Sequence, residues 1–160
     1  MIASKVNSEA SAQPPSVMLQ YLDPSSPYYA MLKKNNIEPN VNVDVLYAYS
    51  LRNRPQSGVI RYLNGIAENK TFINGTLYYP SPYVFTYLVT KAHSEGNVKE
   101  LEPSIANIMD FIISTQKPDG SWGNDLNTAL ATVSLLNTGY EGKPLDKAME
   151  CILDGQNKFS

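Results

Sequence analysis

The feature that most constrains the fold is a set of three almost uncharged apolar segments. Asn42–Leu51 carries one charge, Asp44, Ser81–Ala92 carries one near its end, Lys91, and Leu126–Thr138 carries none. A helix that is apolar around its whole circumference is buried on every side. The sequence therefore predicts three buried helices, which begin near residues 42, 81 and 125.

A second kind of segment alternates with the first. Apolar residues fall on a single stripe within Gln56–Lys70, Ser104–Gln116 and Pro144–Gln156, and most charged residues lie off it. This spacing is typical of helices with one buried face. Buried and amphipathic helices thus alternate with a period of about 40 residues, which predicts three successive helix hairpins. With the buried helices inside and the amphipathic ones outside, the fold is all-α and the array is an arc of a barrel.

Turn-forming residues agree with these boundaries. Four prolines stand where a first helical turn begins, the position that proline tolerates best: Pro55, Pro82, Pro103 and Pro144. Ser81 is placed to cap the helix that starts at Pro82, and Gly96 and Gly139 stand where a C-terminal cap glycine belongs. The stretch Thr71–Pro80 has the composition of a strand and predicts an extended connection or a short hairpin.

The stretch QKPDGSWGN, Gln116–Asn124, joins the second amphipathic helix to the third buried one. A glutamine side chain both donates and accepts hydrogen bonds, so Gln116 is suited to tie the end of one helix to the start of the next. An indole over that amide shields it from water and adds apolar contact. We interpret Gln116, Gly120 and Trp122 as a structural clamp between hairpins; the alternative is that Trp122 stacks on a ligand.

These residues resemble a known motif. FIISTQKPDGSWGN resembles the QW motif of terpenoid cyclases of the squalene–hopene cyclase type, and LNTALATVSLLNTGYEGKPLDKAMECILDGQ resembles the inner and outer helices that follow it. YYPSPYVFTYLVTKA is similar to an inner helix of the related prenyltransferase-like domains. The resemblance covers about residues 37 to 157 and implies an α/α toroid, of which three hairpins make about half. We therefore expect a flexible N-terminal segment over residues 1–26 and an incomplete toroid domain over 27–160.

The catalytic residues that this resemblance implies are missing from the sequence. Cyclases that start by protonation use an Asp-x-Asp-Asp signature at the start of an inner helix, and here Asn40, Asn42 and Val43 stand at the matching positions. An amide cannot deliver a proton, so Asp44 is the one weak candidate for a catalytic acid. The alternative is that Asp44 stabilises the N-terminus of its helix. The Asp-rich magnesium motif of the ionising cyclases is absent too. The zinc set of protein prenyltransferases is not indicated, because Cys151 falls on an outer helix and His93 is expected at the surface. We predict no metal and no cofactor.

One mouth of the predicted barrel collects polar side chains from the inner-helix N-termini: Asn40, Asn42, Asp44, Tyr78, Tyr79, Tyr83, Asp125, Asn127 and Thr128. Such a set around an apolar pit suits an apolar or isoprenoid small molecule, and it equally suits packing and helix capping. Two functions stay open. The first is a module that lacks the catalytic acids and has a structural or apolar-ligand-binding role. The second is a fragment of an isoprenoid cyclase or prenyltransferase-like enzyme whose catalytic residues lie on a missing half.

Composition limits the partners. A formal net charge of -2 argues against a nucleic-acid binder, and no apolar run approaches the ~18 residues that a membrane span needs. The chain starts without the apolar centre of a signal peptide, which predicts a cytoplasmic protein. An open arc of helices exposes apolar surface, and such surface marks interfaces. The sequence therefore also predicts a homodimer that completes the toroid.

Overall fold

The computed structural model describes residues 38–157 except 55 and 77, and every regular element in this part is helical. The helices are α4 (Pro39–Ser50), α5 (Ser57–Glu68), α6 (Pro82–Ser94), α7 (Glu102–Thr115), α8 (Asp125–Asn137) and α9 (Lys143–Asn157), with short 3-10 helices η1 (Thr71–Asn74) and η2 (Lys99–Leu101). The all-α class is confirmed, and the six α-helices begin within three residues of their predicted starts. The segment predicted over residues 1–26 lies outside the described residues.

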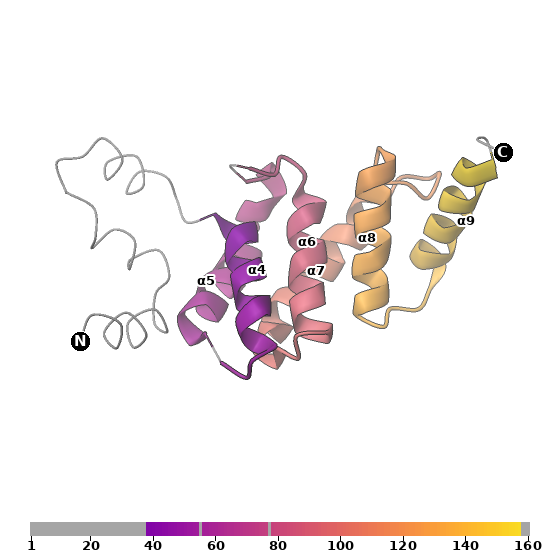
Figure 1. Cartoon of the computed structure of the whole chain (residues 1–160). Helices are drawn as coiled ribbons and strands as arrows, with labels where there is room; N and C mark the ends of the chain where they lie inside the picture. Colours follow the sequence, from indigo (N-terminus) through magenta and orange to yellow (C-terminus); the bar gives the residue numbers. More distant parts are fainter. Residues whose placement is uncertain (1–37, 55, 77, 158–160) are drawn as a thin grey trace, which may run out of the picture.

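The helices form two layers (Figure 1). In one layer α6 packs against α4 on one side and α8 on the other, and in the second layer α5 packs against α7. Each helix of the first layer also packs against the outer helix that follows it in sequence. The helices α4, α6 and α8 are evenly spaced along the sequence, and each begins 43 residues after the one before. The three predicted helix hairpins, α4–α5, α6–α7 and α8–α9, are therefore present.

The prediction that all three inner helices are buried on every side is wrong; α6 comes nearest to it, although Val84, Tyr87, Leu88 and Lys91 along one side of it are half-buried. None of the residues of α6, all of which are described, is exposed. In contrast, α4 leaves Val41 44% exposed and α8 leaves Leu126 62% exposed. The reason is position in the layer: within the described chain α6 has an inner neighbour on both sides, whereas α4 and α8 each have one.

Most of the residues predicted to begin, cap or end a helix do so in the structure. Pro82 is the first residue of α6, Pro103 and Pro144 are the second residues of α7 and α9, and Pro55 lies outside the described residues. The Ser81 Oγ accepts a hydrogen bond from the Tyr83 backbone N–H, 3.3 Å away, which is the predicted cap. Gly139 follows α8 with a φ of +67° and closes it as a cap glycine.

Gly96 is not the left-handed cap glycine that the sequence predicts, and a close contact explains instead why this residue is glycine. The left-handed residue after α6 is Asn97, with a φ of 53°, and not Gly96. A Cβ added at Gly96 would lie 2.5 Å from the Ala92 carbonyl oxygen and 2.7 Å from the Ser50 Oγ. The close approach of the ends of α4 and α6 therefore requires a residue without a side chain here.

The extended connection predicted for residues 71–80 is wrong over its first half, where Thr71–Asn74 forms η1. The fold of this segment follows from the burial of Phe72, which stacks on Phe85 with ring centroids 5.0 Å apart and meets Phe111 edge-on at 5.2 Å. Aromatic pairs add to the stabilisation from buried area alone. The packing of one side chain thus outweighs the strand-like composition of its neighbours.

Candidate functional site

The predicted clamp joins the two outer helices α7 and α9. The Gln116 Nε2 donates hydrogen bonds to the Gly120 carbonyl oxygen at 3.0 Å and to the Pro144 carbonyl oxygen at 2.7 Å. We expected these bonds to reach the next inner helix, but Pro144 belongs to the first turn of α9. The start of α8 is served instead by Asn124, whose side-chain oxygen accepts from the Asn127 N–H at 2.8 Å.

Trp122 is the second part of the clamp and is 3% exposed. Its Nε1 donates to the Ile112 carbonyl oxygen at 2.9 Å, and its backbone N–H donates to the Thr128 Oγ1 at 3.1 Å. Its ring meets Tyr83 edge-on, with centroids 6.4 Å apart. One side chain thus satisfies a carbonyl at the end of α7 while it packs against the start of α6, and its backbone holds the first turn of α8.

The polar side chains at the start of α4 bind the fold itself. The Asn40 Nδ2 donates to the Thr76 Oγ1 at 3.0 Å, and this hydroxyl donates to the Glu38 carboxylate at 2.5 Å. The Asn42 Nδ2 donates to the Glu38 carbonyl oxygen at 2.8 Å. Both asparagines are buried, and the Asn40 Oδ1 accepts no hydrogen bond within the described part of the chain. Asn40 therefore fastens the N-terminus of α4 to the connection before α6, and Asn42 holds the first turn of α4 to its N-cap residue.

The starts of α6 and α8 are fastened to each other in the same manner. The Ser81 Oγ donates to the Asn127 Oδ1 at 2.7 Å, and the Asn127 Nδ2 donates to the Trp122 carbonyl oxygen at 3.3 Å. The Tyr83 hydroxyl donates to the Thr115 Oγ1 at 3.1 Å, and the Thr128 Oγ1 donates to the Asn124 carbonyl oxygen at 2.8 Å. The Ser81–Asn127 bond connects two neighbouring hairpins where their inner helices begin, whereas the Tyr83–Thr115 bond joins the two helices of one hairpin.

The nine residues of the predicted mouth thus fall into two groups. Five form hydrogen bonds within the fold, namely Asn40, Asn42, Tyr83, Asn127 and Thr128. The other four are exposed, namely Asp44, Tyr78, Tyr79 and Asp125. Although Asp44 is exposed as a residue, partial burial of its carboxyl group raises the pKa of Asp44, and the ammonium group of Lys91 on α6 acts in the opposite direction.

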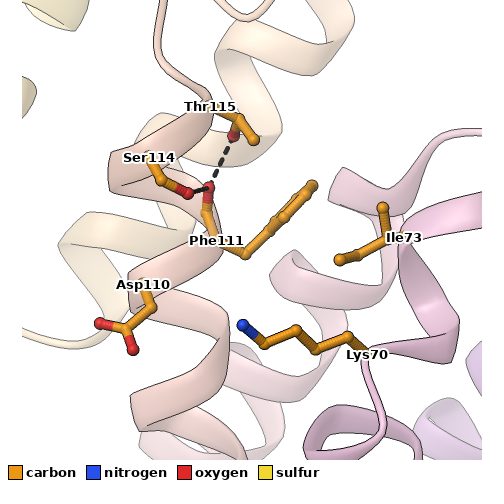
Figure 2. A pocket seen from close by; sticks show the side chains of 6 residues that line it. All are labelled: Lys70, Ile73, Asp110, Phe111, Ser114 and Thr115. Carbon is orange, nitrogen blue, oxygen red and sulfur yellow. Dashed lines mark hydrogen bonds between the residues drawn. The ribbon is translucent and has the colours of Figure 1, made fainter.

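Two hollows of the described surface lie elsewhere. A groove of about 580 Å³ between η1 and α7 is lined by Lys70, Ile73, Asp110, Phe111, Ser114 and Thr115, and Lys70 and Phe111 reach into it from opposite sides (Figure 2). A second groove, of about 520 Å³, runs between α5 and η2. Both grooves are open to solvent and belong to the outer layer. The residues of the predicted mouth line neither of them.

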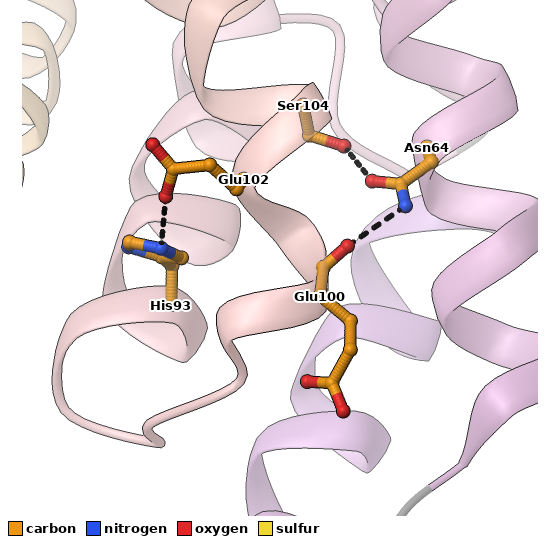
Figure 3. Close-up of polar contacts among 5 residues, drawn as sticks. All are labelled: Asn64, His93, Glu100, Glu102 and Ser104. Atoms are coloured by element: carbon orange, nitrogen blue, oxygen red, sulfur yellow. Dashed lines mark hydrogen bonds and ion pairs between the residues drawn. The ribbon is translucent and has the colours of Figure 1, made fainter.

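His93 is not the surface residue that we expected. Its side chain is 14% exposed, and its Nε2 lies 2.7 Å from the Glu102 Oε2 (Figure 3). Beside this contact the Ser104 Oγ donates to the Asn64 Oδ1 at 2.5 Å, and the Asn64 Nδ2 donates to the Glu100 carbonyl oxygen at 3.0 Å (Figure 3). These contacts join α6, α5 and the start of α7. Among the described residues no group of three His, Cys, Asp or Glu side chains is placed to hold a metal ion.

Because of Tyr62 on α5, the stability of the fold should depend on pH in the alkaline range. Burial, with a smaller contribution from the negative charge of Glu38, raises the pKa of Tyr62 to about 12 from an ordinary value of 10.0. The unfolded chain loses this proton first, so the free energy of unfolding should fall as the pH rises from about 10 to about 12. In the Tyr62→Phe variant this fall should be smaller, as urea titrations across that pH range would measure. Tyr78→Phe, at a position 66% exposed, is the control and should keep the wild-type slope; equal slopes for wild type and Tyr62→Phe would contradict the assignment.

In the part of the chain that the structure describes, every helix is too short or too polar to cross a membrane. Comparisons of the sequence with protein-family models and with curated proteins, and of the structure with solved structures, find no match.

Proposed function

We propose that the chain is an α/α-toroid domain of the terpenoid-cyclase and prenyltransferase-like type that lacks the catalytic acids and acts as a structural module. One observation carries this proposal. At the inner-helix N-termini, where the related enzymes keep their acids, Asn40 and Asn42 are buried and hydrogen-bonded to Thr76 and to the Glu38 backbone. Amides that hold a helix in place have a structural role, and they have no proton to give to a substrate.

The remaining acid, Asp44, does not restore acid catalysis. A carboxyl group that works as a general acid at neutral pH must be held protonated, which needs deep burial or a second carboxylate beside it. Partial burial raises the pKa of Asp44, but the residue is exposed and the ammonium group of Lys91 opposes this rise. A positive neighbour favours the ionised carboxylate. This environment supports the proposal that Asp44 is not a catalytic acid.

We further propose that the inner layer binds an apolar small molecule of the isoprenoid class. Support comes from Leu126 at the start of α8, an apolar side chain that is 62% exposed to solvent. Apolar surface of this kind lowers the free energy of the system when a ligand or a partner covers it. We also propose that the module is a homodimer in which a second copy extends the array of hairpins towards a complete toroid.

A turnover assay and a binding assay test these proposals together. Incubation with squalene, or with farnesyl diphosphate and Mg²⁺, should give no cyclised product by gas chromatography and mass spectrometry; product would overturn the non-catalytic assignment. Farnesol should displace the fluorescent fatty acid cis-parinaric acid from the wild type. Leu126→Asp should weaken this displacement, whereas Ile113→Asp, at a position 39% exposed on the outer helix α7, should not. Equal displacement from both variants, or none from the wild type, would overturn the ligand site.

A further inference from the structure

The inner helices are evenly spaced in the sequence, so equivalent positions can be identified on each of them. Because α4, α6 and α8 begin 43 residues apart, each residue of α8 has an equivalent 43 positions earlier on α6 and again on α4. In an array of repeats each unit contacts only its neighbours, and the same flank of successive units makes the same contact. Exposure at equivalent positions therefore reveals which flanks have a neighbour.

The flank of α6 that faces α8 is fully covered. Thr86 and Thr90 lie on it: the Thr86 Oγ1 and the Ser134 Oγ share a hydrogen bond at 3.2 Å, and the Asn137 Nδ2 donates to the Thr90 Oγ1 at 3.3 Å. Both threonines are 0% exposed. We call this side of an inner helix its trailing flank.

The trailing flank of α8 is uncovered. The equivalents of Thr86 and Thr90 are Ala129 and Val133, and both are exposed, Val133 to 38%. Here apolar side chains stand where α6 has hydroxyls. A pair of exposed apolar residues at positions that are completely buried one repeat earlier predicts a contact with a further helix.

The opposite, leading flank shows the same pattern on α4. On α8 this flank carries Asn127, Ser134 and Asn137, which hydrogen-bond to α6. Their equivalents on α4 are Val41, Ala48 and Leu51, the last being the residue that follows the helix. All three are exposed, Val41 to 44% and Leu51 to 61%. The leading flank of α4 is thus also apolar and also lacks an inner-helix neighbour within the described chain.

We propose that the trailing flank of α8 packs against the leading flank of α4 from a second copy of this chain, in the register that joins α6 to α8. This inference rests on the homodimer of the proposed function and names the surfaces that form it. The free flank of α8 carries the positions that contact α8 when they stand on α6. The free flank of α4 carries the positions that contact α6 when they stand on α8. In a two-fold dimer both junctions form at once, so the four free flanks of the two copies cover one another.

Charge favours this head-to-tail contact. The first hairpin, residues 39–68, carries three arginines, Arg52, Arg54 and Arg61, against the two acids Asp44 and Glu68. The third hairpin, residues 125–157, carries five acids against two lysines; the acids are Asp125, Glu141, Asp146, Glu150 and Asp154. The connections that follow α4 and α8 lie at the same end of the array (Figure 1), which brings Arg52 and Arg54 towards Glu141 of the other copy. Two third hairpins that met each other would bring like charges together.

The experiment measures the molar mass of the full chain by light scattering over a range of concentrations. Val133→Asp changes the trailing flank and Val41→Asp the leading flank, and Ile113→Asp on α7 is the matched control. We expect a wild-type dimer, an unchanged control, and dimer dissociation constants raised at least about tenfold in each flank variant, as for residues central to an interface. Circular dichroism checks that the variants are folded, and Ala129→Lys and Leu51→Asp are second variants at the two flanks.

Mixing the two flank variants distinguishes the head-to-tail contact from a symmetric one. Each variant keeps one intact flank, so a mixture with one partner labelled with ¹⁵N should form a heterodimer with one junction, detected by native mass spectrometry. If Val133→Asp dissociates the dimer and Val41→Asp does not, α8 pairs with α8 and the inference is overturned. If neither variant dissociates it, the inference fails while the homodimer stands. A monomeric wild type overturns both.

Discussion

Replacing Trp122 with alanine should lower the free energy of unfolding by about 3–5 kcal/mol, the usual cost of truncating a large buried aromatic side chain. The indole is 3% exposed, and it donates to the Ile112 carbonyl oxygen at 2.9 Å. Its loss leaves a cavity among α6, α7 and α8 and removes the partner of a carbonyl in the last turn of α7. Urea unfolding followed by circular dichroism measures the change, because the variant has no tryptophan left for a fluorescence signal.

Trp122→Phe separates the two contributions of the indole. Phenylalanine keeps most of the apolar contact but cannot donate to Ile112, so we expect a smaller loss of about 1–3 kcal/mol. The order of stability should be wild type, Trp122→Phe, Trp122→Ala. A loss below about 1 kcal/mol for Trp122→Ala would mean that the hairpins are held together without the clamp.

The helices could be predicted from the sequence because their signals are local. Apolar periodicity and the prolines at helix starts placed all six α-helices, and Ser81 and Gly139 have the capping roles that their positions predicted. The predictions failed where a long-range contact decides the structure. Phe72 folds into η1 because Phe85 and Phe111 meet it, and Gly96 is small because Ser50 approaches it.

The candidate site was harder to predict for the same reason. Residue type indicated that Gln116 bonds to a neighbouring element, but not that its acceptor is the carbonyl of Pro144, 28 residues further on. Asn127 is predicted to line the mouth, but its side chain instead bridges Ser81 and Trp122. The position of His93 beside Glu102 had no sequence signal, because this contact depends on how α6 packs against α7.

Gly120→Ala should lower the free energy of unfolding by about 2–5 kcal/mol, because a side chain at this position meets two separate obstacles. Gly120 has a φ of +84°, in the left-handed region that glycine alone enters freely. A Cβ here would also lie 2.3 Å from the Lys147 carbonyl oxygen and 2.7 Å from its carbonyl carbon. These are backbone atoms within α9, so the helix must move away from the turn, and the bond from Gln116 to Pro144 is strained with it.

Gly139→Ala is the control that separates the two obstacles. Gly139 also has a positive φ, +67°, but a Cβ at this position would have no atom within 4 Å outside its own neighbourhood. Its substitution should therefore cost about 1–2 kcal/mol, the ordinary penalty for an L-residue at a left-handed position. The difference between the two variants, measured by urea unfolding, is the cost of displacing α9 from the turn. Equal losses would mean that α9 can shift freely, and would show that the Gln116 clamp does not hold the third hairpin to the second.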